Sequence, residues 1–238
     1  MRTSNKILLG TLVAILVIIT AIHAALYTKY KRNDFTTMKS LHHERYDVYD
    51  MKGVLSVSFV GLQNVTIIPA DTARLEIQKG GFFKVHYQFE NGVLTVKGDS
   101  IIKRNNNNPE RVRSYQDVIL YLPHIQNIKT DFSELVIRAN KSSVNVDSIV
   151  LELNESTLRL SDENGTVSRF NKITVAKANK STIETGNINV TDLTLNLEDS
   201  RFEEGNMTSD LLTINTDKKS TLKLSGRNIA NAKIVLKP

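Results

Sequence analysis

The sequence contains no cysteine and no tryptophan, and only five histidines are spread over its 238 residues. The absence of cysteine excludes a disulfide framework, a cysteine-ligated zinc site and a lipidated N-terminal cysteine. Phenylalanine is also scarce, so a buried core has to be mainly aliphatic. An exported domain that manages without disulfides fits a bacterium better than a eukaryotic secretory route.

Acidic residues are missing from residues 1–32, which contain five lysines and arginines. These five positive charges account for most of the formal net charge of +6, so the rest of the chain is almost neutral. The nearest approach to a basic cluster there is Lys103-Arg104 with Arg111 and Arg113, and it brackets a run of asparagines. Nucleic-acid binding requires clustered basic residues on the folded domain, so we expect no nucleic-acid partner.

An uncharged run of 20 residues, Ile7–Leu26, lies near the N-terminus. As an α-helix it would be about 30 Å long, which matches the hydrocarbon core of a bilayer. We therefore predict a transmembrane helix over 7–27, after a short cytoplasmic N-terminus over 1–6. A cleaved signal peptide is the alternative, but its apolar region would be about 7–15 residues long. The possible cleavage sites at residues 24–25 also lack a small residue two positions earlier, so an uncleaved anchor is favoured.

Both flanks of this segment are basic, so charge does not set its orientation. The remainder is rich in β-patterned segments, asparagine and serine, which favours export. We expect a single-pass protein of the bacterial inner membrane with its C-terminal domain in the periplasm. Residues 28–52 are polar without a clean period and are predicted to form a stalk. His42-His43-Glu44 within it predict no metal site, because adjacent side chains on a strand point to opposite sides.

From Val54 onward apolar and polar residues alternate with a period of two, which is typical of half-buried β-strands. Asn91-Gly92, between two such runs, predicts a hairpin turn. Residues 103–114 contain four consecutive asparagines followed by Pro109 and are predicted to be a surface loop. No segment after residue 50 shows the 3.6-residue period of a helix, so the domain over 53–238 is predicted to be all-β.

Five serines recur at intervals of 19 to 25 residues, and each is followed two positions later by a large apolar residue. The serines are Ser133, Ser156, Ser181, Ser200 and Ser220, and the apolar residues are Leu135, Leu158, Ile183, Phe202 and Leu222. A repeat of this length indicates stacked supersecondary units. Because no helical return segment is visible, we predict a parallel β-solenoid with coils over about 127–235, preceded by a more antiparallel N-terminal part. Equivalent residues would lie about 4.8 Å apart along the stack, and the apolar column would form one interior file.

Two further columns precede the serines. Five positions before stand Ile128, Leu151, Ala176 and Leu195, and three positions before stand Thr130, Leu153, Ala178 and Leu197. The last copy keeps this order, with Ile214 and Thr216, only if one extra residue lies in 217–219. Such an insertion would be a bulge or a longer turn.

The serines are interpreted as a structural corner column between the two strands of each coil. Two positions before the first four serines stand Asp131, Asn154, Asn179 and Glu198. Asp or Asn there can form an Asx-turn or adopt a left-handed conformation, and stacked hydroxyls could donate hydrogen bonds to one another. A nucleophilic serine needs a partnered base, and no histidine occurs beyond His124. We therefore predict no catalytic residue, no metal site and no cofactor. Leu158→Asp should unfold the stack, whereas Ser181→Ala should cost about 1 kcal/mol.

Three stretches in the N-terminal part of the domain carry a family resemblance: "GVLSVSFVGLQNVTIIPAD", then "LEIQ" with "FKVHYQFENGVLTVKGD", then "DVILYLPHIQNIKTDFSELVI". Together with the serine coils that follow, their order resembles the bacterial family named "putative auto-transporter adhesin, head GIN domain", found mostly in Bacteroidetes. The resemblance covers roughly 53–235 and implies an adhesin-like role without any catalytic residue. Members usually show Gly-Ser or Ser-Gly at the corners, where this chain has Asn, Asp and Lys.

The sequence favours a non-catalytic, membrane-anchored β-solenoid that binds or adheres at the cell envelope. Its partner would be an envelope polysaccharide or a protein, and a protein partner would make the chain an accessory subunit of an envelope membrane complex. A glycan-active parallel β-helix enzyme is the less favoured alternative, since it needs paired carboxylates. The acids available in the coils are Glu152, Asp162, Glu198, Glu203 and Glu204. Glu203 and Glu204 are neighbours on a predicted strand and would face opposite ways.

Overall fold

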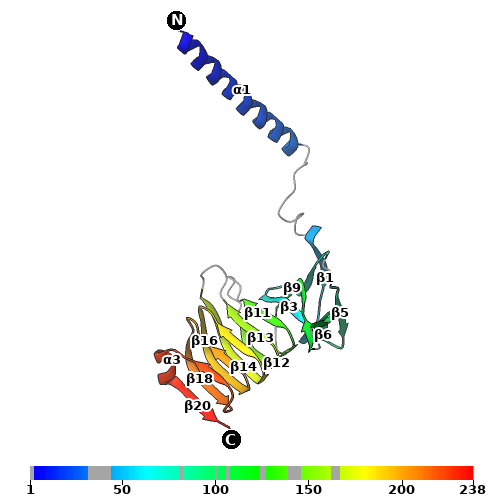
Figure 1. Cartoon of the computed structure of the whole chain (residues 1–238), viewed down its shortest axis with the longest axis vertical. Coiled ribbons are helices and arrows are strands. Elements are labelled where there is room, and N and C mark those ends of the chain that lie inside the picture. The colour runs from blue at the N-terminus through cyan, green and yellow to red at the C-terminus, as the bar shows by residue number, and fades with distance from the viewer. Residues whose placement is uncertain are drawn as a thin grey trace. The chain divides into compact units, whose positions relative to one another are not determined.

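The computed structural model contains two compact units, Met1–Glu44 and Arg45–Pro238, which are described separately here as the helical unit and the β unit (Figure 1). The described residues are 3–31, 44–80, 83–99, 101–105, 108–123, 127–138, 146–161 and 167–237. His42 and His43 of the predicted stalk lie outside them, as does Asp162.

The helical unit is formed by α1 (Thr3–Lys31), which includes the predicted 7–27 segment. Its part from Leu9 to Lys31 is exposed along its whole length and is long and apolar enough to cross a membrane. The polar side chains within it bond to the helix's own backbone. The Thr20 hydroxyl donates to the Leu16 carbonyl at 2.7 Å, and His23 Nδ1 lies 2.8 Å from the Ile19 carbonyl oxygen. Such internal satisfaction is what a hydrocarbon environment demands of polar groups.

The β unit consists mainly of two sheets, which we call sheet A and sheet B (Figure 1). In sheet A the strand order is β1 (Tyr46–Asp50), β4 (Arg74–Gln78), β9 (Ser114–Leu122), β3 (Leu62–Pro69), β11 (Glu134–Arg138), β13 (Thr157–Ser161), β15 (Thr182–Thr185), β17 (Arg201–Glu203) and β19 (Thr221–Lys223). In sheet B it is β5 (Val85–Glu90), β6 (Val93–Gly98), β2 (Ser56–Val60), β10 (Asn127–Asp131), β12 (Val146–Asn154), β14 (Ser168–Asn179), β16 (Ile188–Glu198), β18 (Thr208–Thr216) and β20 (Ala232–Leu236).

Each coil contributes one strand to each sheet, and the coils stack in parallel. From β10 and β11 onward, successive coils follow one another along the chain: β12 with β13, β14 with β15, β16 with β17, and β18 with β19. The predicted β-solenoid is therefore confirmed. The parallel stack also extends beyond the predicted coils, because β2 pairs with β10 and β3 pairs with β11.

The N-terminal end of the β unit contains antiparallel strands, as predicted. β1 pairs with β4, β4 with β9, and β5 with β6. The hairpin between β5 and β6 turns at Asn91 and Gly92, with φ values of 50° and 79°, as expected for a type I′ turn. β1 lies in residues that the sequence assigned to the stalk. That assignment was wrong for 46–50, because "YDVYD" alternates too briefly to reveal a strand before its partner β4 is known.

Two other expectations are corrected by the structure. Residues 103–114 are not simply a loop: β7 (Ile101–Asn105) and β8 (Asn108–Val112) pair as an antiparallel ribbon in which Pro109 is opposite Arg104. Proline is tolerated there because a two-stranded ribbon leaves one edge of each strand without a ladder partner. A short helix, α3 (Gly226–Asn231), also connects β19 to β20, although the sequence shows no helical period there and no helix was predicted after residue 50.

The core is the aliphatic interior between the sheets. Val175, and not Ala176, pairs with Leu151 and Leu195 in the interior file, because β14 carries a bulge over 175–177. The alignment that placed Ala176 in this column was therefore wrong by one residue, and Ala176 is exposed. The extra residue in the last copy is a turn at 218–219, as predicted.

Candidate binding groove on sheet A

The five repeated serines lie in one column at the corners of the coils, where a sheet B strand gives way to a sheet A strand. Ser133, Ser156, Ser181 and Ser200 are buried. The sequence suggested that the stacked hydroxyls bond to one another, but they do not. Instead, each of the last four accepts a hydrogen bond from the backbone N–H of the serine one coil earlier. The Ser133 hydroxyl accepts from the Leu62 N–H at 3.2 Å, and all five hydroxyls donate within their own coil.

The geometry at Ser181 is representative. Its hydroxyl accepts from the Ser156 N–H at 3.1 Å and donates to the Asn179 carbonyl at 2.8 Å. Ser156 is connected to Ser133 in the same way, and Ser200 to Ser181. A hydroxyl has one proton to donate, so satisfying a carbonyl of its own coil leaves only its lone pairs for the neighbouring coil. The serines therefore act as acceptors for backbone N–H groups that would otherwise be buried without a partner.

The residue directly before each of the first four serines adopts the left-handed conformation. Phe132, Glu155, Lys180 and Asp199 have φ between 47° and 50°. The sequence placed this possibility one position earlier, at Asp131, Asn154, Asn179 and Glu198, and that assignment was wrong. Left-handed backbone costs a non-glycine residue roughly 1–2 kcal/mol. It persists here because the corner amides stay in the ladder between coils: Lys180 N–H, for example, donates to the Glu198 carbonyl at 3.0 Å.

The residues two positions before the serines form a side-chain ladder instead of Asx-turns. Asn154 Nδ2 donates to Asp131 Oδ1 at 2.6 Å, and Asn179 Nδ2 donates to Asn154 Oδ1 at 2.8 Å. The apolar column beside them is paired in register, each residue with the next one along the stack. Its members, in order, are Leu135, Leu158, Ile183, Phe202 and Leu222. The first four are buried, and Leu222 is partly buried at the last coil.

Three of the acids considered for glycan cleavage are engaged in separate ion pairs, and a fourth, Glu204, is held by hydrogen bonds. Glu152 pairs with Lys129 at 3.2 Å, and Glu198 lies 3.9 Å from Lys177. Glu203 pairs with Arg201, whose hydrogen bond lowers the pKa of that carboxyl, the opposite of what a general acid requires. Glu204 accepts hydrogen bonds from the Ser225 hydroxyl and N–H. The described residues also contain no group of three or more His, Asp or Glu side chains that could hold a metal ion.

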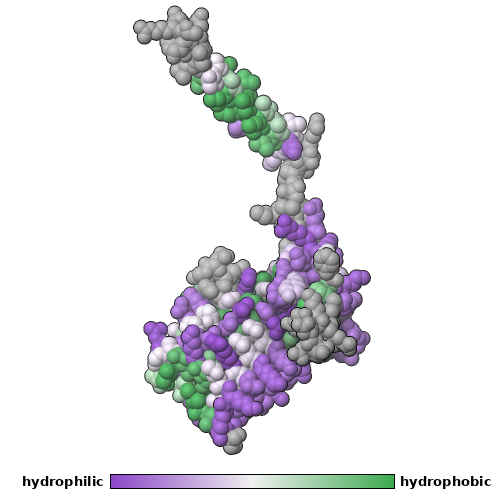
Figure 2. Space-filling model, viewed as in Figure 1, coloured by the Kyte–Doolittle hydropathy of each residue, from purple (hydrophilic) through white to green (hydrophobic). Residues whose placement is uncertain are grey.

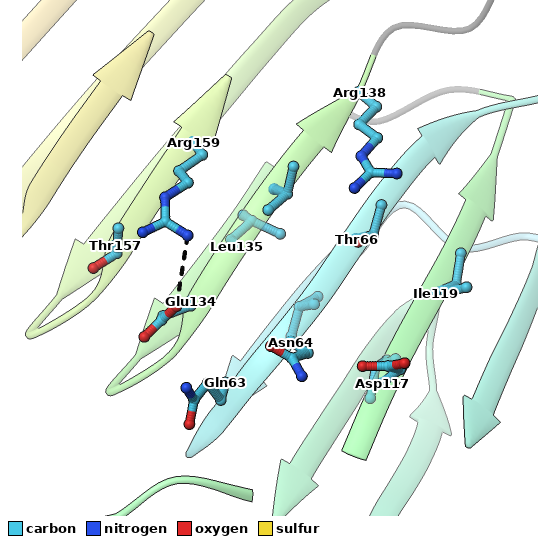
Figure 3. A pocket seen from close by; sticks show the side chains of 13 residues that line it. Gln63, Asn64, Thr66, Asp117, Ile119, Glu134, Leu135, Arg138, Thr157 and Arg159 are labelled. Atoms are coloured by element: carbon cyan, nitrogen blue, oxygen red, sulfur yellow. Dashed lines mark ion pairs between the residues drawn. The ribbon is translucent and has the colours of Figure 1, made fainter. Parts of the chain in front are cut away.

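A groove of about 420 Å³ lies on the outer face of sheet A, over β9, β3, β11 and β13 (Figure 3). Its floor is formed by short side chains in one row across neighbouring strands, since Val136 is paired with Thr66 and Thr66 with Ile119. Longer side chains border this row. The lining therefore joins β9 and β3, from the first half of the chain, to β11 and β13 from the repeats.

Polar groups of different chemistry occupy the borders of the groove (Figure 3). On one side stand the amides and carboxylates of Gln63, Asn64, Asp117 and Glu134, and on the other the guanidinium groups of Arg138 and Arg159.

Most of these charges are held by neighbours. Glu134 accepts a hydrogen bond from Arg113 at 2.9 Å and lies 3.9 Å from Arg159. Arg159 donates from Nε to Glu184 at 2.8 Å, and this bond, with the negative charges of Glu184 and Glu134, raises the pKa of the guanidinium. Asp117 accepts from the Tyr46 hydroxyl at 3.3 Å, and burial together with this carboxylate raises the pKa of Tyr46.

Arg138 differs from the other charged residues of the groove. It is exposed at the end of β11 and, within the described part of the chain, its guanidinium has no ion pair. A guanidinium offers a planar fork of donors that suits a carboxylate or phosphate. The groove thus combines fixed hydrogen-bonding groups with one cation that is available to a ligand. The sequence did not single out this groove, because its lining comes from strands far apart along the chain.

No family model matches the chain, and no curated protein matches it. Among solved structures, it is similar to a "putative adhesin" from Parabacteroides distasonis, with 8% identity, a TM-score of 0.48, and coverage of 80% of this chain and 75% of that one. A "putative adhesin" from Bacteroides fragilis has 11% identity and a TM-score of 0.34, covering 80% and 94%. A "putative lipid binding protein" from P. distasonis has 13% identity and a TM-score of 0.37, covering 75% and 81%.

Proposed function

We propose that this chain is a membrane-anchored, non-catalytic binding protein that presents its β unit in the periplasm and binds an envelope ligand in the sheet A groove. α1 supports the anchor, because it is long, uncharged over Ile7–Leu26 and internally satisfied in its polar side chains. The membrane is proposed to be the bacterial inner membrane. Membership of the head GIN domain family is proposed on the sequence segments that resemble it.

The observation that carries the proposal is the position of Arg138 beside a row of fixed polar groups on parallel strands. The stacked coils hold these groups at a spacing of about 4.8 Å across the sheet, so little conformational entropy is lost when a ligand binds. Amide, carboxylate and hydroxyl side chains hydrogen-bond to hydroxyl-rich ligands, and Arg138 adds a partner for a negative charge. The ligand class that fits this arrangement is an acidic polysaccharide of the envelope.

The test is calorimetric titration of the full chain in detergent micelles with polygalacturonate, an acidic polysaccharide, and with dextran, a neutral one. We expect binding of polygalacturonate and none of dextran. Arg138→Gln should weaken binding at least about tenfold, since a hydrogen bond to a charged group contributes about 1.5–3 kcal/mol and 1.4 kcal/mol corresponds to a factor of ten. Arg169→Gln is the matched control, because Arg169 is exposed on β14 in the other sheet.

Three results would contradict the proposal. Equal loss in Arg138→Gln and Arg169→Gln would indicate unspecific charge attraction, and absence of binding would leave the groove without this ligand class. Release of new reducing ends by the wild-type chain would favour the glycan-active enzyme instead.

A further inference from the structure

The interior files of the solenoid end in an open coil at β20. Along sheet B one file runs through Ile128, Leu151, Val175, Leu195 and Ile214, which are at most 2% exposed, and continues to Ile234, which is 47% exposed. Leu236, which is 58% exposed, is paired with Thr216 and continues the neighbouring file. At the other end of the same sheet the outermost strand is β5, whose Tyr87 and Phe89 are 39% and 38% exposed, less than Ile234 and Leu236. The β20 end therefore leaves core-facing side chains uncovered.

In the space-filling view, a hydrophobic area covers the region of α3 and β20, whereas most of the visible surface of the β unit is hydrophilic (Figure 2). Its exposed apolar residues are Leu211, Ile229, Ile234, Val235 and Leu236. Contiguous apolar surface of this kind marks an interaction site in proteins.

The backbone of β20 is also open on its outer edge. β20 pairs with β18 on its inner edge, and Lys237 N–H donates to the Thr216 carbonyl at 2.7 Å. Backbone groups alternate in direction along a strand, so those of Ile234 and Leu236 point away from β18. Within the described residues, no strand pairs with this outer edge.

The charged residues that follow Asp217 along the chain are of one sign. After Asp217 the sequence contains no acidic residue and six basic ones: Lys218, Lys219, Lys223, Arg227, Lys233 and Lys237. Lys233 and Lys237 are exposed and alternate with the core-facing residues of β20. A strand added here would therefore meet Ile234 and Leu236 on the core-facing side, and Lys233 and Lys237, with Val235 between them, on the other side.

We propose that the outer edge of β20 binds an extended segment of a partner protein in which apolar residues alternate with acidic ones. Main-chain hydrogen bonds would continue sheet B, the apolar side chains would cover Ile234 and Leu236, and the acidic side chains would face Lys233 and Lys237. A second copy of this chain fits less well, because antiparallel pairing centred on Val235 would set Lys233 against Lys237 of the other copy. A lipid surface fits less well, because open backbone groups are costly in hydrocarbon.

The test uses the full chain in detergent micelles and two synthetic peptides, one alternating valine with glutamate and one alternating valine with lysine. The readout is amide hydrogen exchange at Ile234 and Leu236, together with the affinity for each peptide. We expect the glutamate peptide to bind and to slow exchange at both amides at least about tenfold, and the lysine peptide to do neither. The double variant Lys233→Glu with Lys237→Glu should reverse this preference.

Leu236→Pro isolates strand addition from simple charge attraction. It removes an N–H that points to the outer edge and spares the Lys237 bond to Thr216, so β20 should remain paired with β18 while peptide binding is lost. Leu236→Ala is the matched control, which keeps the N–H and should retain the exchange protection.

Several outcomes would overturn the proposal. These are equal binding of both peptides, binding without protection of the two amides, and protection that appears with protein concentration alone, which would indicate a second copy. Protection by vesicles of anionic lipid but by neither peptide would indicate a membrane surface instead.

Discussion

Ser181→Ala removes the acceptor of a buried backbone N–H at the centre of the corner column. In the native protein this hydroxyl accepts from Ser156 N–H at 3.1 Å and donates to the Asn179 carbonyl. The carbonyl keeps a second partner, because Glu155 N–H also donates to it at 2.9 Å. The Ser156 N–H therefore dominates the loss, and an unsatisfied buried donor costs about 1–3 kcal/mol. The sequence-based value of about 1 kcal/mol lies at the lower end of this range.

The assay is thermal unfolding of the full chain in detergent micelles, followed by circular dichroism. For a unit of this size, each kcal/mol lowers Tm by roughly 2–4 °C. Ser148→Ala is the matched control, since Ser148 is exposed on β12 and its loss should change stability by less than about 0.5 kcal/mol. If Ser181→Ala were as neutral as Ser148→Ala, the serine hydroxyls would not support the neighbouring coil and the corner interpretation would be refuted.

Two further predictions concern the core and the corners. Leu158 is fully buried between Leu135 and Ile183, so Leu158→Ala should lower the free energy of unfolding by about 2–5 kcal/mol, and Leu158→Asp should abolish folding. Tm measures the first effect, and the yield of folded protein measures the second. A folded Leu158→Asp variant would contradict the interior file. Lys180 has φ of 47°, so Lys180→Gly should raise the free energy of unfolding by up to about 1 kcal/mol, whereas Lys180→Val should lower it by about 1–2 kcal/mol. Denaturant unfolding of the pair checks this, and the opposite order would show that the corner is not left-handed.

The repeating part of the fold could be predicted from the sequence because each coil places the same type of side chain at the equivalent position. The serine at each corner and the apolar residue two positions later mark equivalent points, and parallel pairing brings them together. Leu135 and Leu158 are therefore paired as their spacing suggests. The extra residue before Ser220 could also be located, because it interrupts an otherwise regular spacing.

Features that depend on pairing between distant segments could not be predicted. In sheet B, β2 lies between β6 and β10, and in sheet A, β3 lies between β9 and β11. The first coil along the chain is therefore not the first coil in the stack. The bulge at Val175 was hidden because Ala176 is also apolar, and the left-handed residues Phe132 and Lys180 are types that rarely adopt that conformation.

The candidate groove illustrates the same limit. Val136 and Thr66 are separated by most of the antiparallel N-terminal part, and only their pairing creates a row of short side chains. Arg138 reads in the sequence as an ordinary charged residue at the end of a strand. Its availability to a ligand depends on which charges surround it in three dimensions.

Disulfide formation between pairs of introduced cysteines tests the register of the stack most directly, and the chain has no native cysteine to interfere. Lys129 is paired with Glu152, and both are exposed on sheet B, so their Cα atoms should lie about 4.8 Å apart, within disulfide range. Val150, two residues earlier on the same face, would be about 8 Å from Lys129 and out of range. The stacked arrangement predicts rapid oxidation of the 129–152 pair and none of the 129–150 pair. Oxidation of the 129–150 pair, or of neither, would contradict it.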